Sequence, residues 1–134
     1  MTILALDLGS RSLGWVTESS SGVLRMAALP RGTEHADMRL ARTLDRVARW
    51  LPDHIMEHNP ELLVVENPFH PALRELMGLV RLIAYRHEVL LTVVQPRTWM
   101  AWARKAGITW DKSDEEDARV INLWAQSNVK VEEQ

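Results

Sequence analysis

Cysteine is absent from the 134 residues, and lysine, tyrosine and phenylalanine are scarce. The lack of cysteine excludes disulfides and zinc–thiolate sites, and it suits a protein of a reducing compartment. No run of about 18 apolar residues is present, so we expect no membrane span. No lysine or arginine precedes the first apolar segment, so we also expect no signal peptide. These absences favour a cytoplasmic protein.

The composition is that of an ordinary globular chain, with 46% apolar and 25% charged residues. We predict a single domain over residues 1–127 and a polar C-terminal tail over residues 128–134. The net charge of −2 does not by itself indicate a nucleic-acid partner. Arginine far outnumbers lysine among the 16 basic residues. Arginine binds phosphate well, although composition alone favours a GC-rich coding sequence as the explanation.

Apolar patterning predicts five strands and four helices. The expected strands cover residues 2–6, 13–17, 22–29, 61–66 and 89–94, and the expected helices cover residues 36–51, 73–87, 97–106 and 113–126. We expect Pro52 to end or kink the first helix, and we expect Gly78 to allow another helix to approach the second closely. Three hairpin strands followed by alternating helices and strands predict an α/β fold. Its five-stranded mixed sheet has three antiparallel strands, then parallel strands, with helices on both faces.

Acidic residues end two of the apolar strands. Asp7 follows the first strand and Glu66 ends the fourth, and a parallel crossover would bring both to the same sheet edge. The last helix begins with Asp114 and Asp117, which share one face because they are three residues apart. Each signal has a simpler explanation by itself: a turn cap, a salt-bridged strand end, and compensation of the helix dipole.

The joint pattern favours a metal centre. Four carboxylates at one place would repel each other strongly without cations. Hard oxygen ligands of this kind suit Mg²⁺ or Mn²⁺. Two such ions, about 3.5–4 Å apart, can clamp the attacking and leaving oxygens of a phosphodiester. We therefore predict that Asp7, Glu66, Asp114 and Asp117 bind two ions and catalyse phosphodiester hydrolysis.

Four segments resemble, in order, the RuvC-type Holliday-junction resolvases of the RNase H-like nuclease superfamily, above all their short bacteriophage-type members. The segments are LALDLGSRSLGWV, LLVVENPF, VVQPRTW and SDEEDARVINLWA. The resemblance spans nearly the whole chain and implies an RNase H-like fold with Asp7, Glu66, Asp114 and Asp117 as the acidic set. It also implies a homodimer that resolves four-way DNA junctions with Mg²⁺ or Mn²⁺, in the cytoplasm of a bacterium or a phage-infected host cell.

The resemblance also suggests residues that contact DNA. Arg11 follows the turn beside Asp7, and Phe69 lies where an aromatic side chain can wedge into a junction. Arg74 and Arg81 line one side of the second helix. An exposed turn, a packed loop residue and a solvated helix face are the simpler explanations. The segment between residues 94 and 114 is shorter than is usual in the family. The full candidate set is Arg11, Phe69, Arg74, Arg81, Arg97, Lys105 and Lys112.

Several other interpretations remain open at this stage. The opening DLGS segment also resembles the phosphate loop of sugar kinases, actin and Hsp70-type ATPases, but those proteins need a far longer chain. A YqgF-type protein is a further alternative, although such proteins usually lack the VVENP context. A junction-binding scaffold without activity, or a related nuclease acting on other branched or RNA-containing substrates, would use the same fold.

Overall fold

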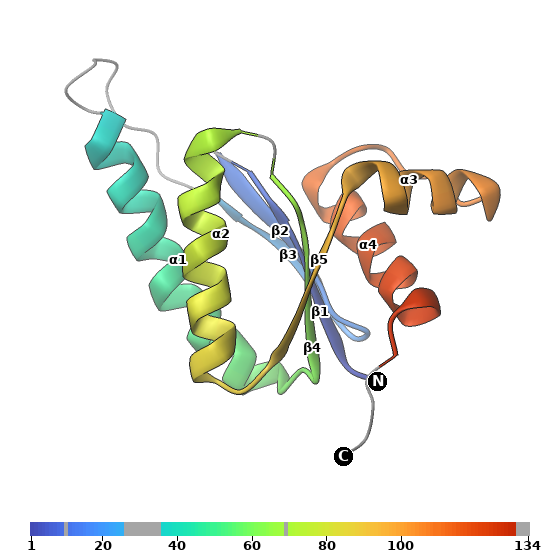
Figure 1. Ribbon diagram of the computed structural model, residues 1–134, viewed down its shortest axis with the longest axis horizontal. Helices are drawn as coiled ribbons and strands as arrows, with labels where there is room; N and C mark the ends of the chain where they lie inside the picture. The colour runs from blue at the N-terminus through green and yellow to red at the C-terminus, as the bar shows by residue number, and fades with distance from the viewer. Residues whose placement is uncertain (10, 26–35, 69, 131–134) are drawn as a thin grey trace.

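One five-stranded sheet organises the molecule (Figure 1). The computed structural model describes residues 1–9, 11–25, 36–68 and 70–130. The strands are β1 Ile3–Leu8, β2 Ser12–Val16, β3 Ser21–Arg25, β4 Leu62–Glu66 and β5 Leu90–Val94. They lie in the order β3-β2-β1-β4-β5, with β1 antiparallel to β2, β2 antiparallel to β3, and β4 parallel to both β1 and β5. The predicted mixed sheet is confirmed, and β1 is its central strand.

Helices cover both faces of this sheet, as predicted. They are α1 Ala36–His58, α2 Pro71–Arg86, α3 Pro96–Lys105 and α4 Asp114–Asn128. Figure 1 shows α1 and α2 on one side of the sheet and α3 and α4 on the other. None of the helices in the described part of the chain is long and apolar enough to cross a membrane.

The alternation of side chains along β1 divides the core into two layers. Leu4 and Leu6 point toward α1 and α2, whereas Ile3 and Ala5 point toward α3 and α4 and pack near Trp99. All of these residues are fully buried. Successive residues of a strand face opposite sides, so a central strand covered on both faces must be apolar throughout. Asp7 is the exception in β1, and it points to the same side as Ile3 and Ala5.

Two local expectations concern Pro52 and Gly78. Of the end or kink expected at Pro52, the structure excludes the end, because α1 continues to His58. Leu51 and Ile55 are both buried on the face toward the sheet, and their burial offsets the hydrogen bond that proline cannot donate. Gly78 is not a site of close approach, since a Cβ atom added there would meet nothing within 4 Å. The predicted strand over residues 22–29 begins one residue earlier, and its part beyond Arg25 lies outside the described residues.

Candidate active site

The first two acidic residues lie on neighbouring strands and on one face of the sheet. Strands β1 and β4 are parallel, with Leu6 opposite Val65, so Asp7 and Glu66 occupy the next position of the two strands. Both follow the alternation that points toward α3 and α4. Asp7 is only 7% exposed, and Glu66 is partly buried. The parallel crossover expected from the sequence therefore brings two carboxylates side by side.

The start of α4 adds the other two acidic residues. Ser113 caps this helix, accepting a hydrogen bond from the backbone N–H of Glu116 at 3.2 Å. The charges of Asp114 and Asp117 both act on Asp7 and raise its pKa, which places the three carboxyl groups in one neighbourhood. The two intervening acids have other partners: the Ser21 hydroxyl donates to Glu115 at 2.8 Å, and the Arg119 guanidinium donates to Glu116 at 2.6 Å. In the first turn of α4, Asp114 and Asp117 therefore lie toward the acids of the sheet. Glu115 and Glu116 instead bind Ser21 and Arg119.

Gly14 determines how closely this turn approaches the sheet. It lies on β2 directly opposite Asp7. A Cβ atom added at Gly14 would come within 2.1 Å of the backbone oxygen of Asp114, far inside any real contact. Only glycine therefore allows the N-terminal turn of α4 to rest on the sheet beside Asp7.

Polar side chains orient two of the carboxylates. The indole N–H of Trp99, in α3, donates to Glu66 Oε2 at 2.6 Å, and this tryptophan is fully buried. The hydroxyl of Ser12 donates to Asp114 Oδ2. Neither donor can move freely, because Trp99 is packed in the core and Ser12 lies in the ladder of β2. Glu66 and Asp114 are consequently held in defined rotamers.

Burial and mutual repulsion disfavour the charged forms of these acids. Burial, followed by the charges of Glu66, Asp117 and Asp114, raises the pKa of Asp7 to about 9. Burial and then Asp114 raise the pKa of Asp117 to about 6, against a lowering hydrogen bond from Asp7. Burial also raises the pKa of Glu66, although the hydrogen bond from Trp99 opposes this. Without cations, the site retains protons at neutral pH.

The acidic residues fit a hard divalent cation. Asp117 Oδ1 is buried without a hydrogen-bond partner, which is costly for a carboxylate oxygen. Asp7, Glu66, Asp114 and Asp117 supply only oxygen ligands, as Mg²⁺ and Mn²⁺ prefer. The carboxylate oxygens of these four acids do not form a group within 4.8 Å of one another. Among the described residues, the three-ligand group within 4.8 Å is instead His54, Glu57 and His58, on the other side of the sheet.

The candidate DNA contacts are spread over the surface, and the charge of one of them acts on the acids. Lys112 lowers the pKa of Asp117 through its charge, as the weakest of several influences. Its backbone has φ of 66°, a left-handed conformation that ends the loop before α4. Phe69 lies outside the described residues. The others are exposed: Arg11 just before β2, Arg74 and Arg81 on α2, and Arg97 and Lys105 on α3.

The sequence analysis missed the residues that support the acids. Ser12 and Gly14 belong to the same opening segment as Asp7, but their roles depend on where α4 lies. Nothing in the sequence around Trp99 indicates its hydrogen bond to Glu66. Asn122 was missed as well: it is buried in α4 and donates to the carbonyl oxygen of Ile3 at 2.9 Å. This bond fixes α4 against β1, on which Asp7 lies.

Comparison with solved structures defines the class of the fold. The Thermus thermophilus RuvC in complex with a Holliday junction substrate matches over 96% of this chain and 97% of its own, with a TM-score of 0.65 and 17% identity. A second Thermus thermophilus RuvC structure matches with a TM-score of 0.61 and 17% identity, over 95% of this chain and 96% of that one. The yeast mitochondrial Holliday junction resolvase Ydc2 matches with a TM-score of 0.55 and 14% identity, over 97% of this chain and 70% of that one.

The chain therefore has an RNase H-like fold. Within that class, its five strands and four helices match RuvC over nearly the full length of both chains. No family model matches the sequence, and no curated protein matches it either. At 17% identity the similarity establishes the fold, whereas the chemistry must be argued from the side chains.

Proposed function

We propose that this protein is a metal-dependent, structure-selective endonuclease that resolves four-way DNA junctions. The observation that carries the proposal is the meeting of Asp7, Glu66, Asp114 and Asp117 from β1, β4 and α4. This acidic set lies in a fold shared with RuvC, whose solved complex contains a Holliday junction substrate. The fold alone is shared by proteins of many functions, so the carboxylates are the decisive part of the argument.

The four carboxylates would hold Mg²⁺ or Mn²⁺, in our proposal two ions per site. When bound, such ions generate a nucleophilic hydroxide from water and stabilise the oxygen that leaves the phosphodiester. The residues of the chain position the carboxylate ligands. Asp7 sits on the central strand, Trp99 and Ser12 orient Glu66 and Asp114, and the cap at Ser113 fixes the first turn of α4. Such preorganisation keeps the ligands in place before substrate arrives.

Lys112 is the basic residue that we assign to the scissile phosphate. It is exposed, yet its charge reaches Asp117. A phosphate that entered the site would therefore meet an ammonium group beside the carboxylates, and this group would stabilise the negative charge that develops during hydrolysis. We propose that Arg11, Arg97 and Lys105 contact the DNA backbone further out, with Arg74 and Arg81 on the opposite layer in the same role.

We further propose that the protein acts as a homodimer, since a four-way junction has two strands to cut. Two exposed apolar side chains on α2 support an interface on that helix: Tyr85 is 82% exposed and Leu82 is 43% exposed. Sedimentation of the purified protein tests this part. A strictly monomeric protein that still cuts both strands symmetrically would contradict it.

A substrate panel tests the proposed activity. The purified protein is incubated with Mg²⁺, with Mn²⁺ or with EDTA, and the substrates are a four-way junction, a replication fork, an RNA–DNA hybrid and a linear duplex. We expect Mg²⁺-dependent cuts, paired across the junction, with little cleavage of the linear duplex. Binding should weaken steeply as salt is raised, because phosphate contacts dominate such binding.

The same panel separates the remaining alternatives. Cleavage without preference for branched DNA would favour a general nuclease with an RNase H-like fold. Tight junction binding without cleavage in either metal would favour a scaffold that has no activity. Either result would overturn the proposed resolvase activity.

A further inference from the structure

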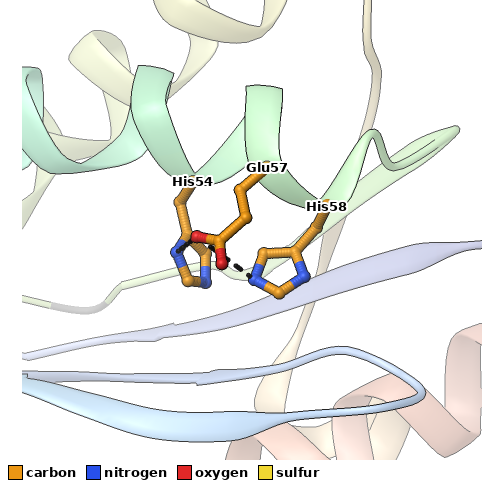
Figure 2. A group of neighbouring side chains, drawn as sticks. All are labelled: His54, Glu57 and His58. Carbon is orange, nitrogen blue, oxygen red and sulfur yellow. Dashed lines mark ion pairs between the residues drawn. The ribbon is translucent and has the colours of Figure 1, made fainter.

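A second cluster of metal-binding side chains lies near the end of α1, on the face of the sheet opposite the acidic residues (Figure 2). It consists of His54, Glu57 and His58. Glu57 Oε2 lies 4.0 Å from His54 Nδ1 and 4.0 Å from His58 Nε2. One ligand atom from each residue lies within 4.8 Å of the others. Figure 2 shows the carboxylate of Glu57 between the two imidazole rings, with all three side chains projecting from the same side of α1.

The polar atoms of His54 lack the partners that a buried imidazole normally has. The residue is only 8% exposed. Its Nε2 has no hydrogen-bond partner, and its Nδ1 stands beyond hydrogen-bonding distance from Glu57. Buried side-chain nitrogens without any partner are uncommon and costly. A cation coordinated by an imidazole nitrogen of His54 would offset part of this cost.

Aromatic packing holds the two rings in place. Trp50 stacks on His54 with ring centroids 4.5 Å apart, and Trp15 from β2 meets the same ring edge-on at 4.1 Å. The His58 ring lies 4.3 Å from that of His54. Because these rings are fixed by their neighbours, little side-chain entropy would be lost when an ion binds.

The chemistry of the cluster selects a different ion from that of the acidic site. Two imidazoles and one carboxylate suit Zn²⁺ and similar transition metals, whereas Mg²⁺ prefers oxygen ligands. Histidines four residues apart on a helix face form a well-known zinc-binding arrangement. With metal–ligand bonds of about 2.0–2.1 Å, tetrahedral ligand atoms stand about 3.3 Å apart, so small rotamer changes would close the site.

Burial of the three residues also indicates an open coordination position. The side chains of His54 and His58 are 10% and 15% exposed, whereas that of Glu57 is 72% exposed. The ion would therefore lie at the rim of the core, with one side open to water.

We propose that His54, Glu57 and His58 bind one Zn²⁺-class cation, separate from the Mg²⁺ or Mn²⁺ of the acidic site. All three ligands lie in the last turns of α1, after Pro52, which leaves the carbonyl of Ala48 without its helical N–H donor. A bound ion would therefore stabilise the C-terminal end of α1. This inference does not depend on the nuclease proposal.

Zinc binding to the metal-free protein tests the proposal. Zn²⁺ is titrated against a chromophoric chelator in excess Mg²⁺, and Co²⁺ is used to record the visible spectrum of a site with nitrogen ligands. We expect one equivalent of Zn²⁺ to bind and the thermal midpoint to rise with Zn²⁺ concentration. His58→Gln and Glu57→Gln should each weaken binding at least about tenfold.

Two variants serve as controls. His87→Gln removes an exposed histidine just beyond α2, and Asp7→Asn alters the acidic site, so both should bind Zn²⁺ as the unaltered protein does. His58 and Glu57 lie at the rim of the core, so their variants should remain folded, as circular dichroism will verify. Zinc binding that survives in both His58→Gln and Glu57→Gln, or that is lost in Asp7→Asn, would overturn the proposal.

Discussion

The two faces of the sheet carry opposite kinds of ligand set. On the side of α3 and α4, four carboxylates come from β1, β4 and α4, which are far apart in the sequence. On the side of α1 and α2, two histidines and a glutamate come from a single stretch of five residues. The first set is assembled by the topology of the sheet, and the second by the pitch of one helix.

This difference explains which features can be predicted from the sequence. The acidic set was anticipated because each acid ends an apolar strand or begins a helix, and such positions meet at one edge of a parallel sheet. The histidine cluster has the clearer local spacing, yet the sequence pattern does not single it out, because the helix is expected to end or kink at Pro52. Only a helix that continues to His58 places His54 and His58 on one face.

The mixed sheet and the place of α4 in the chain follow from the patterning of apolar residues. The contacts that adjust the site do not. Gly14, Ser12 and Trp99 act on partners 33 to 102 residues away in sequence or on backbone that only the tertiary fold brings near. Nothing in their local sequence distinguishes these roles from those of an ordinary strand glycine, a turn serine or a core tryptophan.

The largest expected effect comes from the central acid. Asp7→Asn should lower Mg²⁺-dependent junction cleavage by more than about 100-fold, because a ligand on the central strand is lost. Junction binding should persist, since the phosphate contacts remain. Cleavage and gel-shift assays on the same junction measure both quantities. His54→Gln is the counterpart on the opposite face and should leave cleavage nearly unchanged. Normal cutting by Asp7→Asn would refute the site assignment.

Gly14→Ala tests how closely α4 must approach the sheet. The added methyl group would overlap the backbone of Asp114, so we expect a loss of about 1–3 kcal/mol in unfolding free energy and a marked loss of cleavage. Gly78→Ala is the matched control, with open space around it, and should stabilise α2 by about 0.5–1 kcal/mol. Urea denaturation compares the two variants. Equal stability changes would show that the close approach is unimportant.

Lys112→Ala should reduce cleavage about 10- to 100-fold, because the charge beside Asp117 would no longer stabilise the scissile phosphate. Lys105→Ala removes an exposed charge at the end of α3 and should affect mainly affinity and its dependence on salt. Single-turnover cleavage at saturating enzyme distinguishes the two. If both variants lose cleavage equally, Lys112 has no special role.

The smallest expected effect is a change in how stability depends on pH. In EDTA, the folded acidic site still holds protons at pH values where the carboxyl groups of the unfolded chain have released theirs. The free energy of unfolding should therefore fall as the pH rises toward the pKa of Asp7, about 9. The effect is best measured between pH 7 and 9. Below about pH 6.5 the lowered pKa of His54 makes the free energy of unfolding rise with pH, which opposes the effect of Asp7.

Asp7→Asn should flatten this slope, and Mg²⁺ should reduce it in the unaltered protein by competing with the protons. Glu61→Gln, which changes an exposed acid just before β4, is the control and should leave the slope as it is. Denaturation at three pH values measures the effect. The same slope in Asp7→Asn as in the unaltered protein would contradict the raised pKa of Asp7.

The location of the catalytic cation is the central claim, and Fe²⁺ mapping tests it most directly. Fe²⁺ with ascorbate and peroxide cuts the backbone next to the bound ion, and His54→Gln removes the competing site on the other face. In that variant we predict cuts near residues 7, 66 and 114–117 that excess Mg²⁺ suppresses. An absence of cuts at all three places, or cuts there that Mg²⁺ leaves unchanged, would contradict the account.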